Sequence, residues 1–237
     1  MPSRGRSFRE KLLPEAPVPF YNKTEPAERR NRSRGPCFTK LLKRKGDCRV
    51  LEKLHSGELY DPNDPELLEE QLRCLDRLYD FNATRPTEQG RRAALLKEMF
   101  CEIGEGCYIE PPLHANWGGR FVHFGNKVYA NFGLTLVDDT HIYVGDETLF
   151  GPNVVIATAR HPLEAELRRH ALQSNAPVRI GRNCWIGAGV LIMPGVTVGD
   201  NTVIGAGSVV TRDLPAGVLA VGNPCRVLRR LDGGDLP

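Results

Sequence analysis

From Ile180 onward, an aliphatic residue recurs at every sixth position of the chain. The series consists of Ile180, Ile186, Ile192, Val198, Ile204 and Val210. A period of six matches neither the 3.6 residues of an α-helical turn nor the two-residue alternation of an ordinary strand. It is the spacing of a left-handed parallel β-helix, in which each hexapeptide forms one flat face of a triangular coil and the aliphatic side chain points inward. The chain is therefore predicted to be mainly β.

Glycine and small residues occupy fixed places in the same repeat. Glycine directly follows four members of the series, at Gly181, Gly187, Gly199 and Gly205. We expect it to let the backbone turn the corner of the coil with positive φ. Four places after a member of the series stand small or β-branched residues, which we expect to fit where the corner is tight; these are Val190, Val196, Thr202 and Ser208.

The period of six begins earlier than Ile180, so the β-helix is predicted to cover residues 103–230. Its earlier inward positions are Ile103, Ile109, Phe124, Ala130, Leu136 and Ile142, followed, after a slip of two places, by Val144, Phe150 and Ile156. Residues 111–120 and 138–143 are irregular, and residues 158–177 break the period and predict a loop that protrudes from the coil. Because a regular solenoid is mostly scaffold, we expect the chemistry to lie in these three segments.

Residues 48–102 predict a small helical segment before the coil. Asp64 is suited to the N-cap of a helix that begins at Pro65, and another helix is expected to start near Thr87 and Glu88. The apolar positions that we expect on one face of the first of these helices are Leu67, Leu68, Leu72, Leu75, Leu78 and Tyr79.

The net charge of +3 is unevenly distributed along the 237 residues. Residues 1–45 carry 13 Lys and Arg against 4 Asp and Glu, whereas the remainder has an acidic excess. Together with the prolines at positions 14, 17, 19, 26 and 36, this composition predicts that residues 1–47 are a disordered basic arm. A targeting segment, or an arm that contacts nucleic acid or anionic lipid, is the alternative.

The cysteines and the apolar content bear on the compartment. Seven cysteines are scattered without a C-x-x-C pair, so they are predicted to be reduced thiols rather than zinc ligands or redox pairs. No apolar run approaches the roughly 18 to 20 residues that cross a membrane, and the N-terminus lacks the apolar segment of a secretory signal. We expect a cytoplasmic protein with no membrane span.

Several short motifs together resemble the maltose/galactoside O-acetyltransferases, a family of hexapeptide-repeat acyltransferases. They cover roughly residues 49–230 and consist of Gly57-Glu58-Leu59-Tyr60-Asp61, Tyr79-Asp80-Phe81-Asn82, Glu110-Pro111-Pro112, Tyr129-Ala130-Asn131-Phe132, Val137-Asp138-Asp139, His161-Pro162, Trp185-Ile186-Gly187 and Gly222-Asn223-Pro224. The resemblance implies transfer of an acetyl group from acetyl-CoA to a hydroxyl of a sugar or related polyol. It also implies a homotrimer with active sites between adjacent coils, and no metal.

The resemblance makes His161 the catalytic base. Imidazole titrates near pH 6.5, so it can accept the proton of a hydroxyl and return one to the leaving thiolate. It places Asn131 and Asp139 in the acceptor site, where an amide and a carboxylate can bond hydroxyl groups. Asp61 and Asn116 are further acceptor-site candidates. Asp61 stands one place from the acid of the family pattern, and the chain carries one extra residue between Trp117 and His123.

The acyl-donor side is predicted to be a strip of small residues that lets pantetheine approach the backbone. The resemblance places the backbone of Ala188 at the thioester carbonyl, where an N–H would stabilise the oxyanion, with Ala206 further along the strip. Thr211, Arg212 and Arg226 fall where the family binds the nucleotide phosphates, and the arginine fork pairs well with phosphate oxygens.

Two other functions are compatible with the same coil. A β-helical carbonic anhydrase needs three histidines that converge on zinc, and here His161 and His170 stand nine places apart in an irregular loop. A non-enzymatic trimeric scaffold, with the basic arm as a tether, would need none of these polar residues. Coenzyme A binding separates that scaffold from a transferase.

Overall fold

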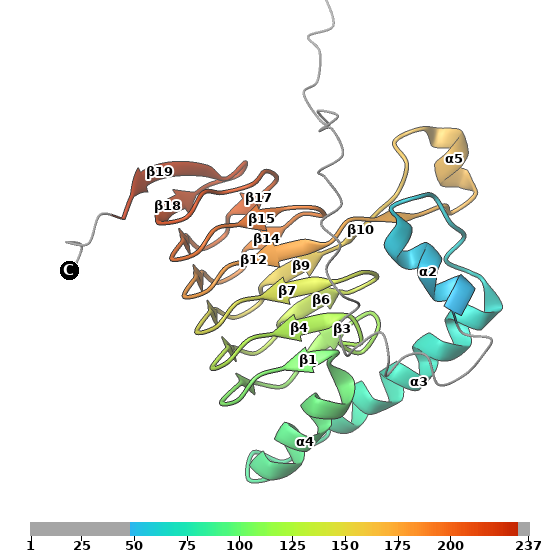
Figure 1. The fold of residues 1–237 in the computed structure, drawn as a ribbon, viewed down its shortest axis with the longest axis horizontal. Helices are drawn as coiled ribbons and strands as arrows, with labels where there is room; N and C mark the ends of the chain where they lie inside the picture. The colour runs from blue at the N-terminus through green and yellow to red at the C-terminus, as the bar shows by residue number, and fades with distance from the viewer. Residues whose placement is uncertain (1–47, 232–237) are drawn as a thin grey trace, which may run out of the picture. The chain divides into compact units, whose positions relative to one another are not determined.

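The computed structural model describes residues 48–231, so the predicted basic arm lies outside the described residues, and with it any contact with nucleic acid. Helices precede a coil of stacked parallel strands, as the sequence predicts (Figure 1). The helices are α2 (Cys48–Ser56), α3 (Pro65–Asn82), α4 (Gln89–Met99) and, in a loop of the coil, α5 (Ala165–Arg169).

The strands of the coil form three sheets, here numbered in the order in which the chain visits them. Sheet 1 consists of β1 (Glu102–Ile103), β4 (Val122–Phe124), β7 (Ile142–Val144), β12 (Val178–Ile180) and β15 (Thr197–Val198). Sheet 2 consists of β2 (Tyr108–Ile109), β5 (Tyr129–Ala130), β8 (Leu149–Phe150), β13 (Trp185–Ile186), β16 (Val203–Ile204), β18 (Val218–Val221) and, antiparallel at its edge, β19 (Arg226–Arg230). Sheet 3 consists of β3 (His114–Ala115), β6 (Thr135–Val137), β9 (Val155–Ala157), β14 (Leu191–Ile192) and β17 (Val209–Val210).

Each turn of the coil runs through sheet 1, sheet 2 and sheet 3 in that order, so the coil has three corners. We call them the 1–2, 2–3 and 3–1 corners after the sheets that they join. The register repeats from one turn to the next, since Trp185 pairs with Val203 and Leu191 with Val209, each 18 residues later. Residues at the same corner of successive turns therefore lie above one another.

The predicted inward series forms the core of the coil. Its members from Ile180 to Val210 are all buried, with at most 3% of the side chain exposed. The small residues four places on are buried as well, and those with hydroxyls bond backbone carbonyls: Thr202 Oγ1 donates to Pro215 O at 2.8 Å and Ser208 Oγ to Gly205 O at 2.6 Å. The predicted parallel β-helix is confirmed.

The expected role of the repeat glycines is wrong in one respect. Gly181, Gly187, Gly199 and Gly205 do not have positive φ. Glycine is required there because the neighbouring turn comes close. A Cβ on Gly187 would lie 2.6 Å from the backbone nitrogen of Ala206. The left-handed conformation falls two places later, at Asn183, Gly189, Asn201 and Gly207.

The helical segment covers the first turns of the coil (Figure 1). Asp64 is the N-cap of α3, as predicted, and its carboxylate accepts from the backbone N–H of Glu66. The expected buried face of α3 is only partly right, because Leu72 is 63% and Tyr79 75% exposed. The side chains that α3 buries are Leu67, Cys74, Leu78 and Phe81. Leu78 and Phe81 join the core of the coil, so that end of the core is covered.

Residues between β9 and β12 leave the coil as a hairpin, which carries α5 at its tip (Figure 1). Its arms are β10 (Ala159–Arg160) and β11 (Ser174–Asn175), which pair antiparallel. The backbone N–H of Ala176 donates to Thr158 O at 2.8 Å and closes the base of the hairpin. Leu149 still pairs with Trp185 across the insertion, so the coil continues in register.

Candidate active site

The three irregular segments of the sequence all contribute chain to the 3–1 corner. Residues 111–120 include β3 and the loop after it, residues 138–143 include the chain after β6, and residues 158–177 follow β9. These strands are neighbours in sheet 3, so segments far apart in the sequence are stacked at one corner. The corner thereby collects four predicted site residues: Asn116, Asp139, His161 and, through its neighbour Tyr60, Asp61.

His161 lies at the start of the hairpin loop with an exposed side chain. Its Nδ1 is 2.8 Å from the carbonyl oxygen of Leu172. A carbonyl can only accept, so Nδ1 carries the proton and donates it, and Nε2 of the neutral ring keeps its lone pair. The backbone thus fixes the tautomer that leaves Nε2 available as a base.

Asp139 is buried at the base of this corner and is held by two side-chain amides. Asn116 Nδ2 donates to both carboxylate oxygens at 3.0 Å, and Gln173 Nε2 donates to Oδ1 at 3.1 Å. Oδ2 therefore has one protein donor, which leaves it capacity to accept from a further hydroxyl. The structure brings Asn116 and Asp139 together, as an acceptor site requires.

Asp138 has a structural environment that differs from that of its neighbour. It is 0% exposed, and its carboxylate accepts from the backbone N–H groups of Trp117 at 2.7 Å and Gly119 at 2.9 Å. Burial raises the pKa of this carboxyl to about 7. Asp138 therefore shapes the loop after β3 from within the protein.

Asp61 is exposed, and its Oδ1 is occupied by a local turn. It accepts from the backbone N–H of Asn63 at 2.9 Å and from Asn63 Nδ2 at 3.1 Å. Asp61 directly follows Tyr60, whose backbone forms a reciprocal bridge with Gln173. It therefore lies beside the hairpin strand that leads from the His161 loop.

The remaining acceptor candidate, Asn131, lies at a different corner. It follows β5 at the 2–3 corner, and its Oδ1 accepts from the backbone N–H of Phe132 at 2.8 Å. Ala188 and Ala206 follow β13 and β16 at the same corner, and both are exposed. Within residues 48–231 neither alanine N–H donates to a backbone carbonyl. A strip of available N–H groups thus runs along the 2–3 corner, where Gly189 and Gly207 leave open space beside it.

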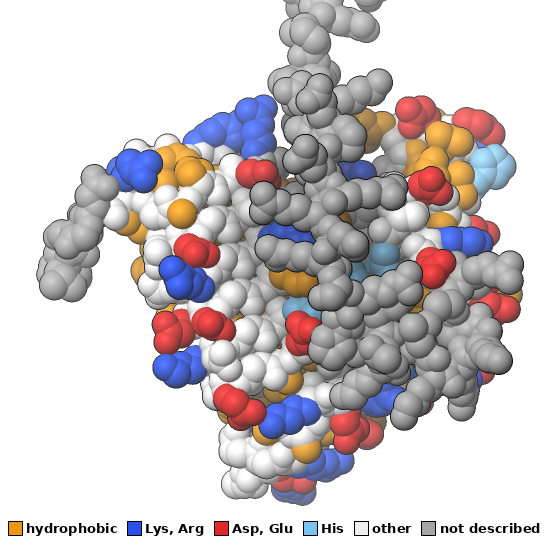
Figure 2. Space-filling model, viewed as in Figure 1, with side chains coloured by type: hydrophobic (Ala, Val, Ile, Leu, Met, Phe, Trp, Pro, Cys, Tyr) orange, Lys and Arg blue, Asp and Glu red, His pale blue; other side chains and the backbone are white. Residues whose placement is uncertain are grey.

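The predicted phosphate ligands lie at the C-terminal end of the coil. Thr211 and Arg212 follow β17, and Arg226 opens β19 with an exposed side chain whose Nη1 donates to Cys225 O at 2.8 Å. In the described part of the chain, Arg212 has no ion-pair partner. Figure 2 shows Lys and Arg side chains gathered over this end, near β18 and β19.

Three residues of the 3–1 corner were not singled out as site residues from the sequence. Tyr60, Gln173 and Asn175 are buried together, and the two amides donate to the Tyr60 hydroxyl at 2.7 and 3.0 Å. Burial raises the pKa of Tyr60 to about 12, so the phenol stays protonated. The sequence signal for Gln173 and Asn175 was the set of polar residues inside the aperiodic segment 158–177, and Tyr60 belongs to the motif at residues 57–61.

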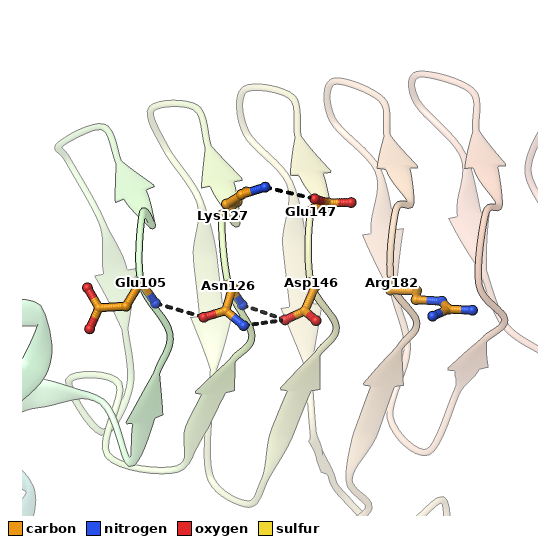
Figure 3. A pocket seen from close by; sticks show the side chains of 6 residues that line it. All are labelled: Glu105, Asn126, Lys127, Asp146, Glu147 and Arg182. Carbon is orange, nitrogen blue, oxygen red and sulfur yellow. Dashed lines mark hydrogen bonds and ion pairs between the residues drawn. The ribbon is translucent and has the colours of Figure 1, made fainter.

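A polar pocket lies at the 1–2 corner, a different corner from the one that holds this cluster (Figure 3). Its side chains bond one another from turn to turn. Asn126 Oδ1 accepts from the N–H of Glu105, Asp146 Oδ1 accepts from the N–H of Asn126 at 2.6 Å, and Lys127 pairs with Glu147 at 3.2 Å. The groups of this ladder are satisfied by the protein itself, so it supports the corner.

The structure also bears on metals, membranes and thiols. Among residues 48–231, no group of three His, Cys, Asp or Glu side chains is arranged to hold a metal ion, and no helix is long and apolar enough to span a membrane. Cys74, Cys107, Cys184 and Cys225 are free, but Cys101 is disulfide-bonded. The prediction that the cysteines are reduced thiols is therefore wrong for Cys101.

Comparison with known proteins gives matches for both the helical segment and the coil. Residues 53–104 match the maltose acetyltransferase hexapeptide capping motif, and residues 177–212 match six repeats of the bacterial transferase hexapeptide. The galactoside O-acetyltransferase of Lactococcus lactis subsp. lactis is 52% identical over 184 residues, which are 78% of this chain and 89% of that protein. A galactoside acetyltransferase solved in complex with coenzyme A is 44% identical, with a TM-score of 0.74 over 76% of this chain and 90% of that one. A maltose O-acetyltransferase from Clostridium difficile 630 is 41% identical, with a TM-score of 0.75 over 77% and 97%.

Proposed function

The chain belongs to the maltose/galactoside O-acetyltransferase family of hexapeptide-repeat acyltransferases, and on that premise we propose that it transfers the acetyl group of acetyl-CoA to a hydroxyl of a sugar or related polyol. The observation that carries the proposal is the hydrogen bond from His161 Nδ1 to Leu172 O. It leaves Nε2 as the proton acceptor in an exposed position of the 3–1 corner, the corner that also carries the Asn116–Asp139 pair.

The reaction follows as a direct transfer. His161 Nε2 takes the proton of the acceptor hydroxyl while the hydroxyl oxygen attacks the thioester carbonyl carbon. The carbon–sulfur bond then breaks, and the proton on Nε2 passes to the coenzyme A thiolate. Asp139 and Asn131 orient the acceptor through its other hydroxyls, with Asn116 and Asp61 at the edge of that site. The N–H of Ala188 stabilises the negative charge that develops on the carbonyl oxygen.

Acetyl-CoA lies, in this proposal, along the 2–3 corner. The small residues Ala188 and Ala206 present N–H groups that no backbone carbonyl of the described residues accepts, which suits the amides of pantetheine. Thr211, Arg212 and Arg226, at the C-terminal end of the coil, bind the phosphates.

A homotrimer would bring the two corners together. His161 and Asp139 lie at the 3–1 corner, whereas Asn131 and the alanine strip lie at the 2–3 corner. The two corners are at opposite ends of the strands of sheet 3. A second coil packed beside the first would place its 2–3 corner opposite this 3–1 corner. The outward face of sheet 2 supports such packing, because Tyr129, Leu149 and Trp185 are cross-strand neighbours on it.

We also propose a cytoplasmic location. The four free thiols support it, and the disulfide of Cys101 counts against it. Cell fractionation with an antibody against the chain decides between the cytoplasm and an oxidising compartment.

The proposed activity is tested with the full chain, acetyl-CoA and a panel of maltose, glucose, galactosides and polyols. We expect acetylated product, detected by mass spectrometry, only with particular acceptors, and coenzyme A binding in their absence. Lack of coenzyme A binding contradicts the proposal and favours the scaffold. Coenzyme A binding without product from any hydroxyl acceptor removes the sugar or polyol as substrate.

A further inference from the structure

Gln173 occupies the centre of the polar cluster at the 3–1 corner. Its side chain is only 7% exposed. Its Nε2 lies 2.7 Å from the Tyr60 hydroxyl, 3.1 Å from Asp139 Oδ1 and 3.0 Å from Asn175 Oδ1. The amide therefore bonds the helical segment, the chain after β6 and the hairpin strand β11 at a single atom.

The backbone of Gln173 is part of the hydrogen bond that orients His161. The Leu172–Gln173 peptide accepts from His161 Nδ1 through its carbonyl at 2.8 Å and donates to Tyr60 O through its N–H at 3.0 Å. Tyr60 N–H returns a bond to Gln173 O at 2.9 Å. Bonds aligned in this way polarise one another, so the Tyr60 carbonyl strengthens the bond that holds the imidazole.

We propose that Gln173 is a positioning residue that fixes His161 and Asp139 relative to each other, its backbone aiming the imidazole while its side chain aims the carboxylate. The inference rests on the proposed function, in which His161 is the base and Asp139 binds the acceptor. It assigns Gln173 no contact with the reacting atoms. Displacement of a catalytic group by about 1 Å can cost on the order of 100-fold in rate, so a link of this kind has a measurable effect.

The chemistry of the position favours an amide. Asp139 Oδ1 needs a donor that carries no charge into a buried site, and Asn175 Oδ1 needs a second donor from the same group. A glutamine NH₂ has two N–H donors, which it shares among Asp139 Oδ1, Asn175 Oδ1 and the Tyr60 hydroxyl. An apolar side chain of similar length supplies neither, and a carboxylate would repel Asp139.

The first test replaces Gln173 with methionine, which keeps the length of the side chain and removes its donors. We expect kcat to fall by roughly 10- to 100-fold, with KM for acetyl-CoA unchanged, because the alanine strip lies at another corner. Gln89→Met is the matched control. Gln89 is exposed at the start of α4, where its Nε2 bonds Pro86 O, and that variant should retain wild-type kcat.

The second test uses Gln173→Glu and a pH profile, which a purely structural role would not alter in shape. Next to the Asp139 carboxylate, the introduced carboxyl has a raised pKa. While protonated it donates to Asp139 as the glutamine does, and once ionised it repels it. Relative to the wild type at the same pH, activity should therefore be retained at low pH and lost as pH rises through that pKa, so the optimum of this variant lies below that of the wild type.

A third readout does not depend on turnover. The ¹⁵N resonances of His161 should report a single Nδ1–H tautomer in the wild type. In Gln173→Met, loss of the side-chain bonds to Tyr60 and Asp139 loosens the Leu172–Gln173 peptide that accepts from the imidazole, so we expect a mixture of tautomers. The inference is overturned if the wild type is active and both variants keep its kcat, pH profile and tautomer. If the wild type acetylates no acceptor, the proposed function fails instead, and the tautomer measurement still tests the link. A Gln173→Met protein that does not fold leaves the Gln173→Glu profile to decide.

Discussion

The 1–2 corner and the 3–1 corner belong to the same turns of the coil, yet they are built differently. At the 1–2 corner, every turn passes from one strand to the next in four residues, and side chains such as Asn126 and Asp146 bond the backbone of the adjacent turn (Figure 3). At the 3–1 corner, three successive turns carry extra chain. Polar groups of these insertions bond one another, from Gln173 Nε2 to Asp139 Oδ1 and from His161 Nδ1 to the carbonyl of Leu172.

The two corners differ in how many of their polar groups remain available to a ligand. The ladder of the 1–2 corner uses its polar groups for neighbouring turns, so it has little capacity left for a ligand. The 3–1 corner leaves Nε2 of His161 and Oδ2 of Asp139 with open capacity at the protein surface or next to it. Substitutions at the first corner should therefore change stability without activity, and substitution of the exposed His161 at the second should do the reverse.

The largest effect should come from His161→Ala. Loss of the general base should lower kcat by about 10²- to 10⁴-fold, while the free energy of unfolding changes by no more than about 0.5 kcal/mol, because the side chain is exposed. Steady-state kinetics and urea denaturation check both values. His170→Ala, an exposed histidine of the same hairpin, should keep wild-type kcat. Wild-type turnover in His161→Ala would contradict the assignment of His161 as the base and of the 3–1 corner as the site of the chemistry.

Gly145→Ala should give the opposite result at the 1–2 corner. A Cβ there would lie 2.7 Å from the carbonyl carbon of Gly181 and 2.8 Å from Cα of Arg182. Both are backbone atoms that cannot move aside alone, so the free energy of unfolding should fall by about 3 kcal/mol. Below the melting temperature, kcat should be unchanged. Gly90→Ala, with nothing within 4 Å of the new Cβ, should be neutral or stabilising, and equal stability of the two variants would contradict the close-packed corner.

Asp138 gives the 3–1 corner a pH-dependent stability. Burial raises the pKa of its carboxyl from the usual 3.8 to about 7, so the folded chain binds this proton more tightly than the unfolded chain does. The resulting stabilisation is complete below pH 4 and is lost as pH rises to 7. Relative to Asp138→Asn, the wild type should lose up to about 1.4 kcal/mol of unfolding free energy per pH unit in that window. Parallel denaturation curves from pH 4 to 7 measure the slope, and a constant difference would show that the carboxyl does not titrate there.

The smallest effect concerns Glu147, which has a φ of 61° at the 1–2 corner. Asn183 and Asn201 also have positive φ at that corner. Asparagine tolerates this left-handed conformation better than most residues other than glycine. Glu147→Asn should stabilise the chain by about 0.5 kcal/mol, since the exposed ion pair with Lys127 contributes little. Thermal melts compared with Lys127→Ala, which removes the ion pair alone, isolate the backbone effect. A clear loss of stability would mean that the pair matters more than the strain.

The sequence predicted the coil well because its core repeats. Inward positions such as Ile186 and Ile204 contact the same kind of residue one turn away, so a local period encodes the tertiary contact. Helix α3 has no such repeat. Its partners are fixed by the fold, and exposed Leu72 and buried Phe81 could not be told apart by spacing alone. The role of the glycines after the inward residues was misassigned for a similar reason, because the close approach involves a different turn.

The candidate site was predicted in part. The motifs pointed to His161 and Asp139, and the broken period pointed to the segments that carry them. The sequence did not reveal that Tyr60 and Gln173, 113 residues apart, share a hydrogen bond, because that contact depends on how the helical segment lies against the hairpin. Nor did it reveal that Asn131 and Asp139 stand at different corners of the coil.

The hairpin between β9 and β12 has a consequence for how such proteins can diversify. Its ends meet at Thr158 and Ala176, and the turns on either side pair as though nothing intervened. The coil therefore sets no upper limit on the length or composition of the inserted hairpin, provided that the two ends of the hairpin stay together. A lineage could exchange this one segment, or an engineer could transplant it, and obtain a new acceptor range on an unchanged frame.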